Sequence, residues 1–353
     1  MSKSNKIAFE ILRTLLAVLI SFAIATIIIF IASDSPGYTL KVFVTAPFSS
    51  AYSFGKILTE ATPLLFTGVA VCIMVKGGQF NMIGEGTFYA GGLFGAIFAI
   101  KLNLPGLLLP LIAILMAGIV SGAIGYVPAK MKASLKINEF VSSLMLNFII
   151  YWVCMYLLAN VFIDPQYSDI ATKQIPDAGR LPYLSFENQV STSFIIGLVI
   201  VAIGTILLYK TKWGYQIRMT GSNENFANYS GINTKKSIVL SQVIGAAIAG
   251  IGGASFILGN YYRFNWKQLP NYGFDGFIIA IIARNNPLLV PFAALFIGYL
   301  RSGASEIALR TDVANEIVFI IQAIIMIIVG ADAFLSGLRQ KKLAQALASK
   351  ELN

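Results

Sequence analysis

Seven polar or ionisable side chains stand inside long apolar stretches of the sequence, and their types make them the first candidates for chemistry. They are Glu60, Asn81, Glu85, Asn147, Gln242, Asp275 and Gln322. A carboxylate in apolar surroundings needs a partner or water, so Glu85 and Asp275 are candidates for lining a polar pathway. For amides, hydrogen bonding between packed helices is the ordinary role. We favour that role for Gln242 and Gln322. For Asn147 we consider both interhelical hydrogen bonding and a place in the pathway.

The spacing of two of these residues predicts that they act together. Asn81 and Glu85 are four residues apart and follow the break Lys76-Gly77-Gly78. On a helix, residues four apart share one face. If the segment is helical, both side chains point together into a central cavity.

A second break precedes the apolar piece that begins at Asp275. The strings Gln79-Phe80-Asn81 and Gly273-Phe274-Asp275 each open an apolar span, and this correspondence predicts two structurally related halves of inverted orientation. Phe80, Phe274 and Phe277 could stack on a flat ring of a ligand. Packing in the core or against lipid is the commoner role of such a side chain.

Absent residues exclude several kinds of chemistry. The sequence has no histidine, which removes the usual general base and the commonest metal ligand. Cys72 and Cys154 lie in apolar stretches, where a small buried thiol is the ordinary interpretation. The nearest match to a phosphate-binding loop, Gly55-Lys56, has Ser50 in place of its first glycine. We therefore expect no enzyme activity, no metal and no cofactor on this chain, and any ATP hydrolysis on a separate chain.

Composition predicts the elements that must position the polar residues. Of 353 residues, 57% are hydrophobic and 12% are charged, whereas soluble domains average roughly a quarter charged. Apolar runs near the ~20 residues that cross a bilayer recur along the chain. Candidate spans are 11–31, 57–75, 83–100, 105–128, 140–162, 194–209, 238–258 and 317–329. The prediction is an all-α polytopic membrane protein with a first helix near 11–31 and a helical core over about 57–329.

The region 273–300 decides the number of crossings. It contains two apolar pieces, 277–283 and 288–300, around Arg284-Asn285-Asn286-Pro287. Merging them would bury a guanidinium at mid-bilayer, at a cost of at least ~2.5 kcal/mol. Counting them separately gives about ten transmembrane helices, most Lys and Arg in the cytoplasm, and both termini cytoplasmic. This distribution accounts for the net charge of +10 without a nucleic acid partner.

Two hydrophilic segments connect the predicted spans. Segment 163–193, outside in this topology, is either a docking surface for an external partner or a plain solvated loop. The inside segment, about 211–236, is longer than a turn needs, and its part 216–229 could form a short helix ended by Gly231. A cytoplasmic tail is predicted over 335–353.

Several strings occur in a fixed order between residues 57 and 329. They are Ala61-Thr62-Pro63-Leu64-Leu65-Phe66-Thr67-Gly68, Gln79-Phe80-Asn81 with Glu85-Gly86, Asn138-Glu139-Phe140-Val141-Ser142-Ser143-Leu144-Met145-Leu146-Asn147, Gly214-x3-Arg218-x2-Gly221-x-Asn223, and Tyr272-Gly273-Phe274-Asp275-Gly276 with Arg284-Asn285-Asn286-Pro287. Together they resemble the permease subunits of bacterial ATP-binding-cassette importers in the branched-chain amino acid and sugar permease superfamily. The similarity is greatest to its nucleoside (simple sugar) branch.

The resemblance implies a substrate-translocating subunit of the bacterial cytoplasmic (inner) membrane, with a single permease domain over residues 1–353. The partners that it implies are a cytoplasmic ATP-binding subunit carrying ATP-Mg, a second permease chain, related or identical, and an extracellular substrate-binding lipoprotein, besides membrane lipid. It also implies that segment 211–236 contains a coupling helix that docks into the ATPase. The coupling residues are Gly214, Arg218, Gly221, Asn223 and Glu224, with Arg218 and Glu224 making polar contacts to the partner. The alternative for Arg218 is an interaction with lipid head groups.

The leading hypothesis is a nucleoside importer whose pathway includes Asn81, Glu85, Asn147, Phe274 and Asp275. Few intramembrane charges suit an uncharged cargo. A monosaccharide permease is the alternative within the superfamily. An ATP-independent secondary transporter that uses Glu85 and Asp275 as ion relays is the alternative from another class, and segment 211–236 argues against it.

Overall fold

The computed structural model of the chain describes residues 23, 26–30, 33–185, 187, 189–313, 320 and 323–324. The predicted first helix over 11–31 and the last span over 317–329 fall largely outside the described residues. Gln322 and the predicted tail over 335–353 fall wholly outside them. The chain forms two compact units, one of residues 1–57 with 299–353 and one of residues 58–298.

Six helices in the described part of the chain are long and apolar enough to cross a membrane. They are α3 (Ala51–Lys76), α5 (Leu108–Leu135), α6 (Glu139–Asn160), α7 (Ser193–Lys210), α10 (Thr234–Asn260) and α12 (Val290–Arg310), the last preceded by the 3₁₀ turn η3 (Pro287–Leu289). Two more apolar helices in the described residues are α4 (Gly84–Lys101), which has 18 residues like α7, and the shorter α11 (Tyr272–Ile282). Apart from one small hairpin the fold is helical, and the chain is a multi-pass membrane protein, as the composition predicts.

The ambiguous region 273–300 forms one short and one long helix rather than two short ones. α11 has 11 residues, whereas α12 with its leading turn spans 24. The turn between them places Arg284 and Asn285 at positive φ, and the Asn286 side chain caps η3 by accepting the Leu288 amide. The predicted separation at the Arg-Asn-Asn-Pro string is therefore confirmed.

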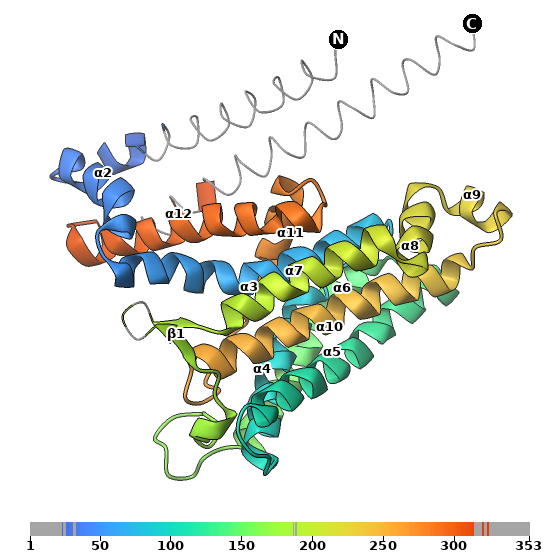
Figure 1. Cartoon of the computed structure of the whole chain (residues 1–353), viewed down its shortest axis with the longest axis horizontal. Coiled ribbons are helices and arrows are strands. Elements are labelled where there is room, and N and C mark those ends of the chain that lie inside the picture. Colours follow the sequence, from blue (N-terminus) through green and yellow to red (C-terminus); the bar gives the residue numbers. More distant parts are fainter. Residues whose placement is uncertain are drawn as a thin grey trace, which may run out of the picture. The chain divides into compact units, whose positions relative to one another are not determined.

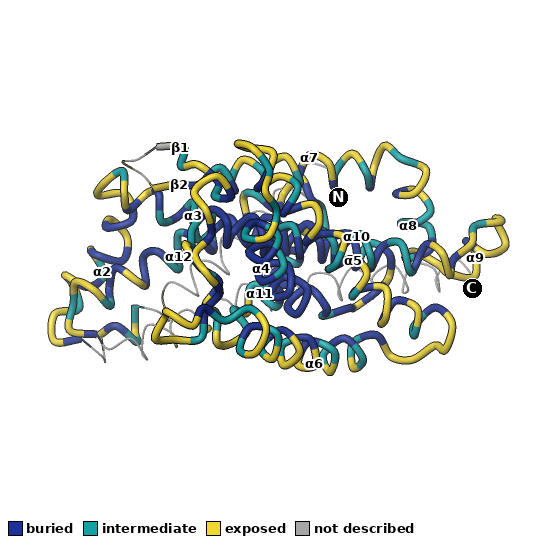
Figure 2. Tube along the Cα trace, turned by 90° about the horizontal axis from the view of Figure 1, so that it is seen from below, coloured by how far each residue is buried: buried dark blue, intermediate teal, exposed yellow. Residues whose placement is uncertain are grey.

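Helix α10 is the centre of the larger unit and packs against α4 and α5 through small residues (Figure 1). A Cβ at Gly91 would fall on the backbone of Gly250, and one at Gly118 would meet the Ile251 side chain 2.6 Å away. Backbones this close gain dispersion contacts that larger side chains would prevent. Figure 2 shows the result, with α4 buried in the middle and α6 exposed at the edge.

The smaller unit contains α2 (Pro36–Thr45), the 3₁₀ turn η1 (Ala46–Phe48) and the neighbouring ends of α3 and α12. Its polar centre is Glu306, which is buried and forms ion pairs with Lys56 at 3.1 Å and Arg310 at 2.7 Å. The Phe48 and Tyr299 rings stack with centroids 5.5 Å apart.

The segment between α6 and α7 is folded rather than a plain loop. It contains the 3₁₀ turn η2 (Asp177–Gly179) and an antiparallel hairpin of β1 (Tyr183–Ser185) and β2 (Val190–Ser191), which the all-helical prediction missed. Its backbone pairs with the stretch after α10, since the Thr172 amide donates to the Phe264 carbonyl at 3.0 Å.

Two ion pairs fasten this folded segment to the same stretch. Asp164 pairs with Arg263, and Asp169 pairs with Lys267 at 2.7 Å. The hydrogen bond from Arg263 lowers the pKa of Asp164, and that from Lys267 lowers the pKa of Asp169.

The predicted single helix over 216–229 is two helices, α8 (Lys212–Ser222) and α9 (Glu224–Tyr229). Asn223 separates them and caps α9, because its side-chain oxygen accepts the Phe226 amide at 3.0 Å. Gly231, at φ +80, follows α9 closely, as the sequence predicts. Figure 1 shows α8 and α9 at the opposite end of the larger unit from the β1 hairpin.

Candidate functional site

The chain is not helical between α3 and α4, over residues 77–83, although both flanking helices are apolar and buried. We call this stretch the helix break. Gly78 has φ +74, a left-handed conformation that favours glycine. Non-helical backbone at membrane depth needs internal hydrogen-bond partners, because lipid offers none.

Three side chains of α6 supply partners to the helix break. Asn147 donates to the Met82 carbonyl at 2.8 Å and accepts the Gly86 amide at 2.9 Å. Ser143 accepts the Met82 amide at 2.9 Å. Glu139 accepts the Phe80 amide at 3.3 Å. Asn147 and Ser143 are fully buried, so these bonds replace contacts that water cannot make there.

Asn81 and α10 hold the helix break from the other side. The Asn81 side-chain oxygen accepts the Ile83 amide at 2.8 Å, and its nitrogen donates to the Gln242 side chain. Gln242 in turn donates to the Gln79 side chain at 3.4 Å. Asn81 and Gln242 have no exposed surface. Gln242 of α10 therefore bonds to side chains of the helix break rather than to a neighbouring helix.

Glu85 closes the site by capping a different helix. One carboxylate oxygen accepts the Asn271 amide at 2.7 Å, and the other accepts the Gly273 amide at 2.6 Å. These amides belong to the start of α11, where unpaired N–H groups and the helix dipole favour a negative charge. A Cβ at Gly273 would overlap the Glu85 backbone, so only glycine allows this approach. The starts of α4 and α11 are thus joined by a buried carboxylate.

The other predicted pathway residues lie in the first turn of α11. Phe274 is half-buried and Asp275 is buried. The structure therefore brings Asn81, Glu85 and Asn147 together around the helix break and connects Phe274 and Asp275 to them through the start of α11. The helical spacing expected for Asn81 and Glu85 does not apply, because α4 begins at Gly84 and Asn81 precedes it.

Sequence reasoning missed Glu139 and Ser143 as partners of the helix break. The available signal was their spacing, since residues 139, 143 and 147 follow one another at intervals of four and share a face of α6. The cap on α11 had no such signal, because Glu85 is 186 residues from Asn271.

An open cleft of about 590 Å³ lies beside the helix break. Its aromatic wall is Phe80, which is 48% exposed and whose ring centroid is 5.6 Å from that of Phe140. Its polar wall contains Asn138 and the ion pair of Lys132 and Glu139, at 2.7 Å. The cleft can offer a stacking surface and hydrogen-bonding groups to one ligand.

The predicted coupling residues have mainly internal contacts. A Cβ at Gly214 would overlap carbonyl groups at the end of α7, and one at Gly221 would overlap the Lys76 carbonyl and the Gly78 amide. Arg218 donates to the Leu208 carbonyl at 3.0 Å, and its guanidinium lies 5.3 Å from the Tyr209 ring centroid. These contacts fix α8 against the ends of α7 and α3.

Helix α9 and the outer face of α8 leave other groups exposed. Glu224 is exposed, and one of its oxygens accepts the Thr234 hydroxyl at 3.5 Å. Exposed aromatic side chains in these two helices are Trp213, Tyr215, Phe226 and Tyr229, the last of which is 93% exposed. Large exposed aromatic groups on a polar segment are typical of a protein interface.

No group of three His, Cys, Asp or Glu side chains in the described part of the chain could hold a metal ion. Cys72 and Cys154 are free and buried.

A family model described as "Branched-chain amino acid transport system / permease component" matches residues 53–330. The glucose ABC transporter permease protein TsgB13 of Haloferax volcanii is 29% identical to the chain over 337 residues, covering 92% of this chain and 88% of that protein. The guanosine ABC transporter permease protein NupP of Bacillus subtilis is 26% identical over 342 residues, covering 94% and 97%. The nucleoside ABC transporter permease protein NupB of Lactococcus lactis is 27% identical over 354 residues, covering 97% and 96%. No solved structure is significantly similar to the chain.

Proposed function

The chain belongs to the family of branched-chain amino acid transport system permease components, and from this premise we propose that it forms the transmembrane pathway of an importer for nucleosides. It is an ABC transporter permease of the nucleoside and sugar branch, and members of the family are transmembrane subunits rather than ATPases. ATP hydrolysis, with its Mg²⁺, therefore takes place on a partner chain.

The observation that carries the nucleoside assignment is the aromatic wall of the cleft at the helix break. A nucleoside has a flat base that stacks on aromatic rings and a ribose that hydrogen-bonds, and Phe80 with Asn138 and Glu139 offers both kinds of contact. Full-length similarity to guanosine and nucleoside permeases supports the same assignment. The similarity to a glucose permease keeps a monosaccharide as the second candidate.

Within this proposal, Asn81, Glu85 and Asn147 position the pathway rather than contact the cargo. All three are fully buried, and their hydrogen bonds go to the helix break and to the start of α11. Phe274 and Asp275 lie in the first turn of α11, the helix whose start Glu85 holds, and we assign them the same positioning role. Exposed Phe80 is the residue we assign to cargo contact.

We assign α8 and α9 to the cytoplasmic interface with the ATPase, with both chain termini on the same side of the membrane. Glu224 and the exposed aromatic groups provide the contacts in this assignment, whereas Arg218 holds α8 against α7. The hairpin side of the larger unit then faces a substrate-binding lipoprotein outside the cell. A second permease chain completes the pathway.

An uptake assay tests the proposed cargo. The complex of this chain, its partner permease and the ATPase is reconstituted in vesicles with the binding protein and given radiolabelled guanosine, adenosine, ribose or glucose. We expect ATP-dependent uptake of nucleosides that excess ribose does not reduce. Uptake of glucose or ribose alone would establish the second candidate, and uptake driven by an ion gradient without ATP would establish a secondary transporter.

Charge reversal tests the proposed interface. In Glu224→Lys we expect lower uptake and less ATPase copurified with the permease, because the exposed carboxylate is replaced by a cation. Asp177→Lys, a charge reversal in the exposed η2 turn, is the matched control. Equal ATPase recovery from both variants would contradict the assignment.

Cysteine labelling tests the orientation. Ser168 and Ser230 are exposed at opposite ends of the larger unit, and both native cysteines are buried. A membrane-impermeant maleimide should label Ser168→Cys in intact cells and Ser230→Cys only after the cells are opened. The reverse result would invert the topology.

A further inference from the structure

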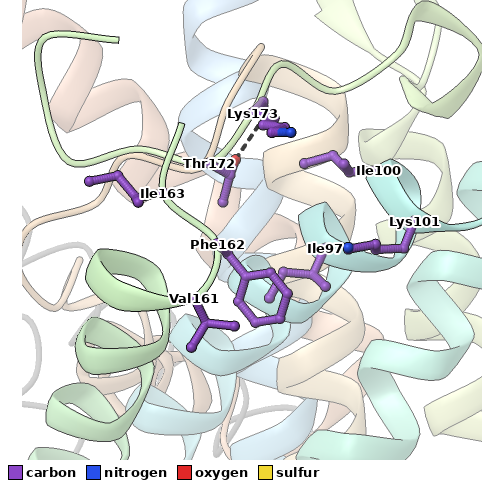
Figure 3. A pocket seen from close by; sticks show the side chains of 8 residues that line it. All are labelled: Ile97, Ile100, Lys101, Val161, Phe162, Ile163, Thr172 and Lys173. Carbon is purple, nitrogen blue, oxygen red and sulfur yellow. Dashed lines mark hydrogen bonds between the residues drawn. The ribbon is translucent and has the colours of Figure 1, made fainter. Parts of the chain in front are cut away.

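A cavity of about 380 Å³ lies where α4 and α6 end (Figure 3). It is separate from the helix break and its cleft. Its size lies within the roughly 300–1,000 Å³ typical of ligand sites. Five of its eight lining residues are apolar.

The apolar lining comes from two elements. Ile97 and Ile100 belong to the last turns of α4, and Val161, Phe162 and Ile163 follow the end of α6. Figure 3 shows the Phe162 ring near Ile97 on one wall. These side chains can contact an alkyl chain of a ligand, which needs no hydrogen bonds.

Exposed apolar side chains continue from this cavity along α6. Trp152, Val153 and Tyr156 are each more than half exposed, as is Val161 at the cavity. In a membrane protein such a helix face contacts acyl chains. A lipid lying along α6 would therefore reach the cavity.

Two cations lie at the rim of the cavity. Lys101 is the last residue of α4, and Lys173 lies in the folded segment. Both are exposed, and neither forms an ion pair with any residue that the structure describes. The neighbouring acids have other ion-pair partners, Arg263 for Asp164 and Lys267 for Asp169, and the charge of Lys173 adds only a minor part to the lowered pKa of Asp164. The rim therefore keeps two positive charges for a ligand.

The backbone at Lys173 is held by the neighbouring residue. The Thr172 hydroxyl donates to the Lys173 carbonyl at 3.1 Å and accepts the Phe264 amide at 3.1 Å. The backbone that carries the lysine is thus held before a ligand arrives, which reduces the entropy lost on binding.

We propose that this cavity binds an anionic phospholipid, with its phosphate between Lys101 and Lys173 and the start of one acyl chain against the apolar lining. The two lysines must supply the attraction, because the ends of α4 and α6 present carbonyl groups, which repel an anion. Lysine at the end of a membrane helix lies at the depth of lipid head groups.

Native mass spectrometry of the full chain tests the proposal. The chain is released from detergent in the presence of phosphatidylglycerol, or of phosphatidylcholine with the same acyl chains. The test variant is Lys101→Gln with Lys173→Gln, and the control is Lys41→Gln with Lys210→Gln. The control removes the same charge from exposed lysines outside the cavity, one of them the last residue of α7.

We expect wild type and the control to retain phosphatidylglycerol in preference to phosphatidylcholine. The test variant should bind phosphatidylglycerol about fivefold more weakly for each lysine removed, or about 25-fold in total. Equal retention of the two lipids, or equal losses in the two variants, would overturn the proposal. Displacement of the lipid by an equal concentration of glycerol 3-phosphate would also overturn it, because a soluble phosphate would then suffice.

Discussion

Replacing Glu85 by Gln should weaken the junction between α4 and α11 while leaving the shape of the side chain almost unchanged. In the wild type, each carboxylate oxygen accepts one backbone amide, from Asn271 at 2.7 Å and from Gly273 at 2.6 Å. A Gln side chain has one acceptor oxygen, so its NH₂ group would face the second amide, and two donors would oppose each other.

The size of the effect follows from those two bonds. A hydrogen bond to a charged group contributes about 1.5–3 kcal/mol, and a buried amide left without a partner costs about 1–3 kcal/mol. Losing the negative charge at the start of α11 removes about 0.3–1 kcal/mol more. Together these contributions amount to about 3–7 kcal/mol, so we expect Glu85→Gln to lower the free energy of unfolding by at least about 3 kcal/mol.

Thermal unfolding in detergent and hydrogen exchange at α11 measure this change. The melting temperature should fall by at least about 4 °C, and exchange should rise first at the Asn271 and Gly273 amides. Glu187→Gln, at an exposed glutamate, is the matched control and should behave as wild type. A Glu85→Gln chain with wild-type melting and wild-type exchange at α11 would refute the cap.

Three further changes address other contacts. Gly221→Ala should reduce uptake while the chain still inserts, because the new Cβ overlaps the backbone at the end of α3. The control is Gly37→Ala, whose new Cβ meets no atom within 4 Å, and it should transport normally. Equal uptake by the two variants would contradict the importance of the Gly221 contact. Asn147→Leu leaves the Met82 carbonyl of the helix break and the Gly86 amide of α4 without their partner and should lower the unfolding free energy by about 2–6 kcal/mol. An unchanged melting point would argue against the role of Asn147. Because Arg263 lowers the pKa of Asp164, their pair stabilises the folded segment fully above the ordinary value of 3.8 and loses this effect as the pH falls through the lowered value. Hydrogen exchange, corrected for intrinsic rates, should show that acid-induced opening in wild type, whereas in Arg263→Gln exchange should be faster already at neutral pH and depend less on acid.

The spans could be predicted because a bilayer limits the length of an apolar run. The predicted span 238–258 corresponds to α10, Thr234–Asn260, and the predicted span 57–75 corresponds to α3, Ala51–Lys76. Both helices are longer than predicted, because helical hydrogen bonding continues beyond the apolar residues into polar ends.

The location of the helix break could be predicted, but the partners that hold it could not. Gly77 and Gly78 mark the end of α3 in the sequence as in the structure. The Glu85 contact depends on how two distant segments pack, and no local pattern encodes it. Without the structure, a buried carboxylate indicates only that a partner exists, and a substrate and a helix start fit equally well.

Arg218 illustrates a different limit of sequence reasoning. A cation in a basic segment predicts contacts with a partner or with lipid. The structure places its guanidinium on the Leu208 carbonyl, because α8 turns back directly after α7 ends. The residue type predicts a cation at this position. The direction of the Arg218 side chain depends on the turn between α7 and α8, which the residue type does not predict.

The approach of Gly221 to Gly78 has a mechanical consequence. Contacts through side chains are compliant, since rotamers can absorb a displacement of several tenths of an ångström, but two touching backbones have no such slack. A displacement of α8 toward Gly78 therefore moves the seven residues between α3 and α4 directly, because no side chain lies between the two backbones to absorb it. Those residues lack the repeated backbone hydrogen bonds that stiffen a helix, so we expect the bundle to bend there first.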